Sequence, residues 1–175
     1  ANPEAARRRW RLAAIWLAIL SASCVVHTYV AAIDAGRHGK AIPLWQIGLY
    51  EGSSHLVILA LVRALYWLDR RWPATGGAPN LGVRLLAVVP FSAAHIIGMV
   101  ALRLLAFGVV GAPRYPYAFT PAEIPYEFAK DVFTYAMLSV GVVALGYLLG
   151  RRESPLATVT AAPLPAAVVP ERFTV

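Results

Sequence analysis

The sequence predicts an all-α polytopic membrane protein: a bundle of four transmembrane helices with both termini in the cytoplasm, followed by a disordered or extended C-terminal linker. The first observation is composition, because 59% of the 175 residues are hydrophobic and 14% are charged. A soluble domain of this length is closer to about half apolar and about a quarter charged. The second is the presence of four long apolar stretches, and the third is the clustering of arginines beside them. Lipid can cover the excess apolar surface.

The four apolar stretches cover residues 12–33, 47–68, 85–110 and 128–149. Each is long enough to cross a hydrocarbon core of about 30 Å at a rise of about 1.5 Å per residue. Inside lipid the backbone polar groups must be paired within the segment, so the stretches are predicted to be helices. Pro90 is expected to kink the third helix one turn before His95, because proline removes a backbone hydrogen bond.

The arginines predict the orientation of these helices. Basic residues precede the first stretch, lie between the second and third, and follow the fourth: Arg7, Arg8, Arg9, Arg11, Arg70, Arg71, Arg84, Arg151 and Arg152. The connections on the other side carry only Arg37, Lys40 and Arg114. Because cytoplasmic loops are enriched in Lys and Arg, we expect a multi-pass protein of the bacterial inner membrane with cytoplasmic termini.

The connections and the C-terminal segment complete the predicted organisation. Residues 34–44 and 72–80 contain the Gly and Pro residues typical of turns. Residues 111–125 form the longest outer connection, interpreted either as an interfacial loop or as a lid over an outward-facing cavity. Residues 1–150 are the predicted helical domain. Residues 151–175 are rich in Ala and Pro, which favours a linker that leads into a cytoplasmic domain absent from this sequence.

Ionisable side chains inside a membrane are costly and are usually paired or functional. Here they gather toward the outer halves of the helices. Glu51 and His55 share a helix face by their spacing, and Arg103 is expected to pair with Glu51, Glu127 or Asp131 through its guanidinium group. The sequence leaves open whether the whole set is a signal-binding pocket or a structural polar network; its members are Glu51, His55, His95, Arg103, Glu127, Lys130 and Asp131.

The residue types that usually bind metals or cofactors, or that act in catalysis, are few in this sequence. Cys24 is the only cysteine, so an intrachain disulfide and a cysteine-rich metal site are excluded. His27, His55 and His95 suggest haem or metal binding as an alternative, but they lie on three helices at different depths, so no metal and no cofactor is predicted. The sequence contains no phosphate-binding glycine loop and no metal-hydrolase motif, and it is not expected to be an enzyme.

The sequence also contains two pairs of small residues at helical spacing and three motifs that resemble those of a known family. Ala94 and Gly98, and likewise Gly146 and Gly150, have the spacing that permits close helix contact. The motifs are Tyr50-Glu51-Gly52-Ser53-Ser54, His95-x-x-x-Met99-x-x-Leu102-Arg103 and Tyr126-Glu127-Phe128-x-Lys130-Asp131-x-x-x-Tyr135. They resemble the N-terminal membrane half of proteobacterial LytTR-family transcriptional regulators, and residues 170–175 resemble the start of the DNA-binding domain of that family. Ala129 departs from the family pattern, which has a second basic residue before Lys130.

This resemblance implies a one-component regulator in which four helices perceive a signal and the linker transmits it to a cytoplasmic DNA-binding domain. DNA would then be bound only through the domain absent from this chain, and a homodimer is expected because such regulators act on repeated sites. The implied small-molecule signal is not identified. Two alternatives stay open: a small membrane redox protein that holds haem or quinone, and a structural subunit of a membrane complex.

Overall fold

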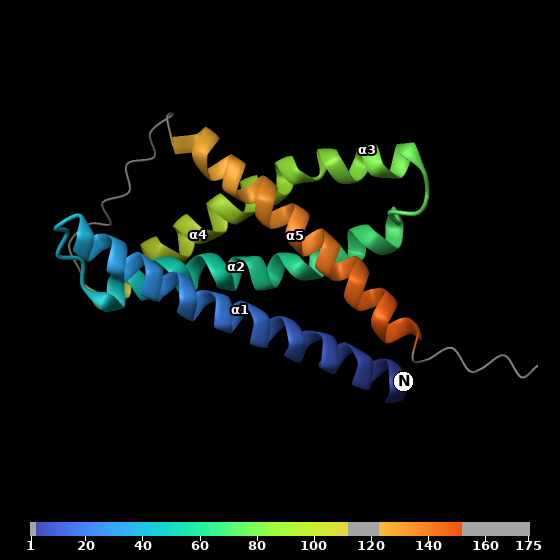
Figure 1. The fold of residues 1–175 in the computed structure, drawn as a ribbon, viewed down its shortest axis with the longest axis horizontal. Helices are drawn as coiled ribbons and strands as arrows, with labels where there is room; N and C mark the ends of the chain where they lie inside the picture. Colours follow the sequence, from blue (N-terminus) through green and yellow to red (C-terminus); the bar gives the residue numbers. More distant parts are fainter. Residues whose placement is uncertain (1–2, 112–122, 152–175) are drawn as a thin grey trace, which may run out of the picture.

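The computed structural model describes residues 3–111 and 123–151, and these residues are almost entirely helical (Figure 1). No strand occurs within them, so the all-α prediction is confirmed for this part of the chain. The five helices are α1 (Pro3–Arg37), α2 (Leu44–Arg71), α3 (Ala78–Leu86), α4 (Val88–Val110) and α5 (Glu123–Arg151). The 111–125 connection and the 151–175 linker lie mostly outside the described residues; 123–125 begin α5.

The helices extend beyond the apolar stretches at both ends. The predicted range 12–33 lies inside α1, 47–68 lies inside α2, and 128–149 lies inside α5. Polar flanks do not stop these helices, because basic residues such as Arg70 and Arg71 in the last turn of α2 interact favourably with the helix dipole. Instead, glycines with positive φ lie at the connections: Gly39 after α1, Gly77 before α3 and Gly111 after α4.

The third predicted helix is divided, and its start is wrong in the prediction. Helical structure begins at Ala78 rather than at residue 85, and α3 and α4 are separated at Ala87. Pro90 explains the division, since it has no N–H to donate to the Leu86 carbonyl and its ring crowds that carbonyl. Figure 1 shows α3 and α4 running in different directions. The kink expected at Pro90 is therefore present, three residues earlier in the chain.

Helix α2 lies at the centre of the bundle, where it packs against α1, α4 and α5. Of the four predicted membrane spans, the one in α2 is the least apolar, because Glu51, His55 and Arg63 lie within it. The more apolar helices pack against this more polar one, although Leu56, Arg63 and Trp67 of α2 are exposed. The buried core lies along the second half of α2 and consists of Trp16, Leu20, Ile58, Val62, Leu65, Leu68, Phe91, Tyr135, Leu138 and Val142.

Two glycines allow close helix contact in this bundle. A β-carbon at Gly98 would lie 3.0 Å from Val57 of α2, and one at Gly141 would lie 2.8 Å from the ring of Trp16 in α1. Of the predicted Ala94–Gly98 pair, Gly98 makes the close contact, whereas Ala94 is exposed. Gly146 differs, because no described atom outside its own helix backbone lies within 4 Å of a β-carbon placed there.

A buried arginine joins α3 to its neighbours. Arg84 donates from Nη1 to the Asp69 carboxylate at 2.7 Å and to the Trp72 carbonyl at 3.2 Å. The Tyr135 hydroxyl of α5 donates to the Arg84 carbonyl at 2.6 Å. Arg84 therefore fixes the short helix against both α2 and α5, at the end of the bundle opposite the α1–α2 connection (Figure 1).

Three helices are long and apolar enough to cross a membrane by length and composition: Ala6–Arg37, Ala78–Val110 across the break, and Ile124–Leu149. Their outer surfaces carry large apolar side chains, with Leu86, Val109 and Phe133 among the most exposed. A soluble protein rarely exposes so much apolar surface. The described chain is thus compatible with a membrane protein, and the fourth predicted span, α2, is the polar helix at the centre.

The start of α1 and the end of α5 lie on the same side of the bundle (Figure 1). The Arg8 guanidinium donates to the Gly146 carbonyl at 3.5 Å, which joins the two ends directly.

Candidate functional site

A buried polar network joins α2, α4 and α5. At its centre is His95 of α4, whose Nδ1 lies 2.7 Å from Asp131 Oδ1 of α5 and whose Nε2 lies 2.9 Å from Ser54 Oγ of α2. The Ser92 hydroxyl donates to the second carboxylate oxygen of Asp131 at 2.6 Å. Only 2% of Asp131 and 5% of His95 are exposed. Both carboxylate oxygens and both imidazole nitrogens therefore have partners.

The carboxylate determines how the protons of this network are placed. An ionised Asp131 only accepts hydrogen bonds, so His95 donates from Nδ1. Neutral His95 then has its lone pair on Nε2, and Ser54 donates to it. The hydrogen bonds therefore run in one direction, from Ser54 to His95 and from His95 to Asp131.

The order Ser54–His95–Asp131 has the connectivity of nucleophile, base and orienting acid found in serine hydrolases. Acyl transfer also needs N–H donors directed at the developing oxyanion. The N–H groups beside Ser54 lie inside α2 (Leu44–Arg71), where the helix uses them in its own hydrogen bonds. Those N–H groups are therefore not free to form an oxyanion hole, and the contacts of the network hold α2, α4 and α5 together.

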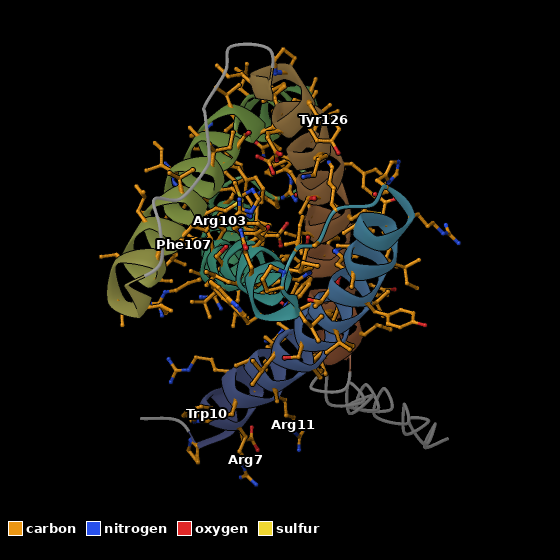
Figure 2. All side chains as sticks on the ribbon, turned by 90° about the vertical axis from the view of Figure 1, so that its left-hand side faces the viewer. Arg7, Trp10, Arg11, Arg103, Phe107 and Tyr126 are labelled. Carbon is orange, nitrogen blue, oxygen red and sulfur yellow. The ribbon has the colours of Figure 1, made fainter. Side chains whose placement is uncertain are left out.

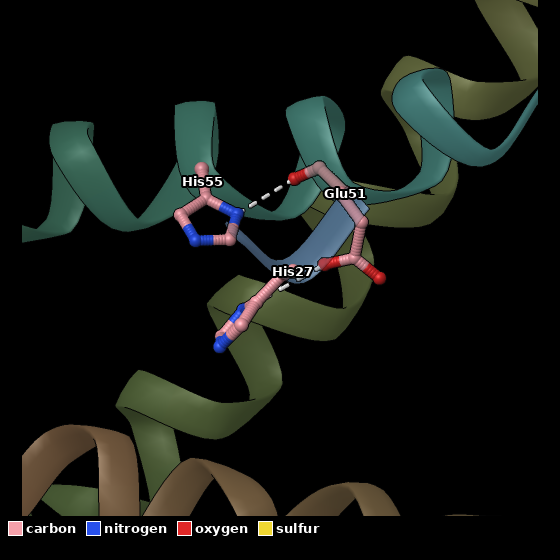
Figure 3. A group of neighbouring side chains, drawn as sticks. All are labelled: His27, Glu51 and His55. Atoms are coloured by element: carbon pink, nitrogen blue, oxygen red, sulfur yellow. Dashed lines mark hydrogen bonds and ion pairs between the residues drawn. The ribbon is translucent and has the colours of Figure 1, made fainter. Parts of the chain in front are cut away.

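A second cluster joins α1 to α2 and contains His27, Glu51 and His55 (Figure 3). His55 Nδ1 lies 2.9 Å from the Glu51 carbonyl oxygen, and its Nε2 lies 3.1 Å from Ser23 Oγ. His27 Nδ1 lies 3.9 Å from the Glu51 carboxylate, and the two imidazole rings are edge-on at 5.3 Å. A pocket beside this cluster is lined by His27, Val30, Ala31, Ile33, Asp34, Arg37 and Glu51.

The positions of the histidines differ from the prediction. His27, His55 and His95 were expected to lie too far apart in depth to converge, yet His27 and His55 meet. His95 belongs to the other network, where its Nδ1 faces Asp131 and its Nε2 faces Ser54. Any metal or haem hypothesis therefore depends on His27 and His55, with Glu51 as the third ligand.

Arg103 of α4 binds the backbone and a hydroxyl of α2 (Figure 2). Its Nε donates to Ser53 Oγ at 3.0 Å, and its Nη2 donates to the Tyr50 carbonyl at 2.9 Å. The guanidinium also lies 5.0 Å from the centre of the Tyr50 ring, in cation–π geometry. Of the carboxylates predicted to pair with Arg103, Glu51 lies against His27, Asp131 binds His95 and Glu127 binds Lys130.

Glu127 and Lys130 form an ion pair of their own on the surface of α5. The Lys130 ammonium lies 3.1 Å from the Glu127 carboxylate, and 54% of the Lys130 side chain is exposed. The ammonium also lies 5.2 Å from the centre of the Tyr126 ring. The predicted polar set therefore divides into a buried network, a histidine cluster, an arginine contact and a surface pair.

The His95 network and the His27–Glu51–His55 cluster lie on different sides of α2, because consecutive residues of a helix point in different directions. Ser53 and Ser54 bond to Arg103 and His95 of α4, whereas His55 bonds to Ser23 of α1. A helix turns by about 100° per residue, so adjacent side chains reach different neighbours. Ser23, Ser54 and Ser92 were missing from the predicted site. Spacing was the signal for two of them, because Ser92 precedes His95 by three residues and Ser23 precedes His27 by four, and Ser54 was part of the motif at residues 50–54.

No family model, curated protein or solved structure matches this chain.

Proposed function

We propose that this chain is the membrane-embedded sensory and anchoring domain of a LytTR-type one-component transcription regulator. The observation that supports it best is the buried Ser54–His95–Asp131 network, because it couples two helices of the bundle to α5. Helix α5 leads directly into residues 152–175, the predicted linker. A change in helix packing at this network would therefore reach the C-terminal segment through one continuous helix. The three sequence motifs that resemble the family also supply Ser54, His95 and Asp131.

The break at Ala87 gives this coupling a mechanical element. His95 lies about two turns after the break, so a change in the angle between α3 and α4 would move its imidazole relative to Asp131. We infer that the signal biases two arrangements of α4 and α5 that differ in this hydrogen bond. Pro90→Ala would restore the missing backbone bond, and an unchanged output in that variant would contradict a hinge at this position.

The proposal includes four membrane spans with both ends of the helical domain in the cytoplasm. In this arrangement α2 crosses the membrane at the centre of the bundle, where the other helices cover Ser53 and His55 and partly cover Glu51, while Arg63 is exposed nearer the cytoplasmic end. The adjacency of Arg8 and Gly146 supports an even number of crossings. The arginines on that side support a cytoplasmic location.

This orientation predicts a labelling pattern in intact cells. In a Cys24→Ala background, Lys40→Cys lies in the α1–α2 connection, and Arg9→Cys and Ala74→Cys lie on the opposite side. A membrane-impermeant maleimide should label Lys40→Cys in cells with a permeable outer membrane, and the other two only after lysis. Labelling of Ala74→Cys before lysis would exclude four spans in this orientation.

The regulatory role predicts changed transcription when the network is altered in the full-length protein at its own locus. Asp131→Asn removes the negative charge and nearly preserves the shape of the side chain, so transcripts under the control of the regulator should change about as they do on deletion of the gene. Glu127→Gln is the matched control, because it makes the same change one turn earlier on the same helix, at a carboxylate that pairs with the exposed Lys130 and not with the network. RNA sequencing at equal protein levels is the measurement. If deletion leaves every transcript unchanged, the regulatory function is wrong.

A further inference from the structure

We propose that His27, Glu51 and His55 bind a divalent transition metal ion, for which Zn²⁺ is the best match. The binding site is independent of the proposed regulatory function. Only the additional idea that the ion is the signal would depend on that function.

The donor set is the first argument. Two imidazoles and one carboxylate are a ligand combination that Zn²⁺ accepts, and three protein ligands leave a fourth position for water. Imidazole donors favour zinc and similar transition metals over Mg²⁺ and Ca²⁺, which prefer oxygen. In the part of the chain that the structure describes, this is the one group of at least three such side chains close enough together to share an ion.

The distances are the second argument. One ligand atom from each of the three side chains can be chosen so that all lie within 4.8 Å of one another. Zinc–ligand bonds of about 2.0–2.2 Å in a tetrahedron place the ligand atoms about 3.3–3.5 Å apart. The cluster must therefore contract by roughly 1–1.5 Å. His27 can provide this by rotation of its side chain, because 59% of that side chain is exposed.

The orientation of His55 is the third argument. Its Nδ1 lies 2.9 Å from the Glu51 carbonyl oxygen, and a carbonyl can only accept, so Nδ1 carries the proton. The lone pair is then on Nε2, the atom available to a metal. A metal-bound histidine usually donates its other N–H to a backbone carbonyl or carboxylate, and this is the arrangement at His55. Ser23 Oγ now lies 3.1 Å from Nε2 and would have to turn toward the water in the fourth position.

The pocket gives the ion a route to the cluster. Its lining includes both His27 and Glu51 and extends to Asp34 and Arg37 in the last turn of α1. Asp34 and Glu51 attract a cation, while Arg37 opposes it in part. Since these residues lie at the α1–α2 connection, an ion can reach His27 from water without crossing the apolar core. Binding would then join α1 to α2 at this end of the bundle.

The test is a zinc titration of the purified, tag-free full-length protein in detergent, in competition with a chromophoric chelator. We expect one Zn²⁺ per chain, and at least about tenfold weaker binding for His27→Gln, because loss of one ligand costs no less than loss of a supporting residue. His38→Gln is the matched control, since His38 is also exposed on the same side of the bundle and bonds with Asp34. Glu51→Gln should weaken binding as His27→Gln does.

Co²⁺ provides the second measurement. Replacement of Zn²⁺ by Co²⁺ should give the visible absorption of a tetrahedral site in the wild type and not in His27→Gln. Equal zinc affinity in the wild type and His27→Gln would overturn the site, as would a wild-type dissociation constant of about 1 mM or weaker. Equal weakening in His38→Gln and His27→Gln would show adventitious binding only. These results do not affect the regulatory proposal, because its own test uses Asp131 and transcript levels.

Discussion

Replacement of Asp131 with alanine is expected to lower the free energy of unfolding by about 2–5 kcal/mol. Asp131 accepts one hydrogen bond from His95 and one from Ser92, and only 2% of it is exposed. Alanine leaves both donors buried without their acceptor. A buried donor without a partner costs about 1–3 kcal/mol, and loss of one member of a buried charged pair costs about 3–5 kcal/mol.

The measurement is unfolding in mixed micelles with increasing SDS, followed by circular dichroism and by the fluorescence of the five tryptophans. Glu127→Ala is the control, since Glu127 pairs one turn earlier on α5 with Lys130, and the pair reaches the surface through Lys130, whose side chain is 54% exposed against 16% for Glu127. Exposed pairs contribute about 0–1 kcal/mol, so the control should unfold close to the wild type. A similar small loss in both variants would show that the Asp131 network contributes little to stability.

A double-mutant cycle separates the network from the single side chains. His95→Ala and Asp131→Ala remove the two ends of one 2.7 Å contact, so their effects should not add. We expect the double variant to lose about 0.5–3 kcal/mol less than the sum of the single losses. Additive losses would mean that each side chain acts alone and that α4 and α5 are not coupled at this position.

The helices could be predicted from the sequence because lipid imposes a simple condition on length. A stretch of about 20 apolar residues must become helical to pair its backbone groups, and the ranges 12–33 and 128–149 lie inside α1 and α5. The ends could not be predicted in the same way. A helix can continue from lipid into water. The end of each helix is therefore set by local residues, such as Gly39 and Gly111, and not by the edge of the apolar stretch.

The partners within the site were harder to predict for a different reason. Spacing shows which side chains share a helix face, but not which neighbouring helix that face meets. The contacts of Arg103 with Ser53 and with the Tyr50 carbonyl, for example, were not predicted. If α4 turned about its axis by the angle between two consecutive residues, the Arg103 side chain would point about 100° away. That is enough to bring it to a different neighbouring helix. Serines are common in membrane helices, so Ser54 gave little signal.

Valine at Gly141 is expected to destabilise the contact between α1 and α5, with a loss of about 1–3 kcal/mol. A β-carbon there would lie 2.8 Å from Cη2 of Trp16, closer than a carbon atom can approach without a shift. Trp16 cannot move easily, because it is buried in the core and its indole N–H donates to the Tyr66 hydroxyl at 3.1 Å. The added methyl groups therefore push the two helices apart or break that hydrogen bond.

Gly146→Val is the matched control on the same helix, because no described atom outside its own helix backbone lies within 4 Å of a β-carbon there. The same substitution should be near neutral at this position, since valine has a somewhat higher helix propensity than glycine. Unfolding in SDS gives the stabilities, and a shift in tryptophan emission reports on Trp16. If Gly141→Val and Gly146→Val unfold alike, α1 and α5 are not in close contact at Trp16. Trp16→Phe should partly restore the stability of Gly141→Val, because the smaller ring leaves room for the valine even though the bond to Tyr66 is lost.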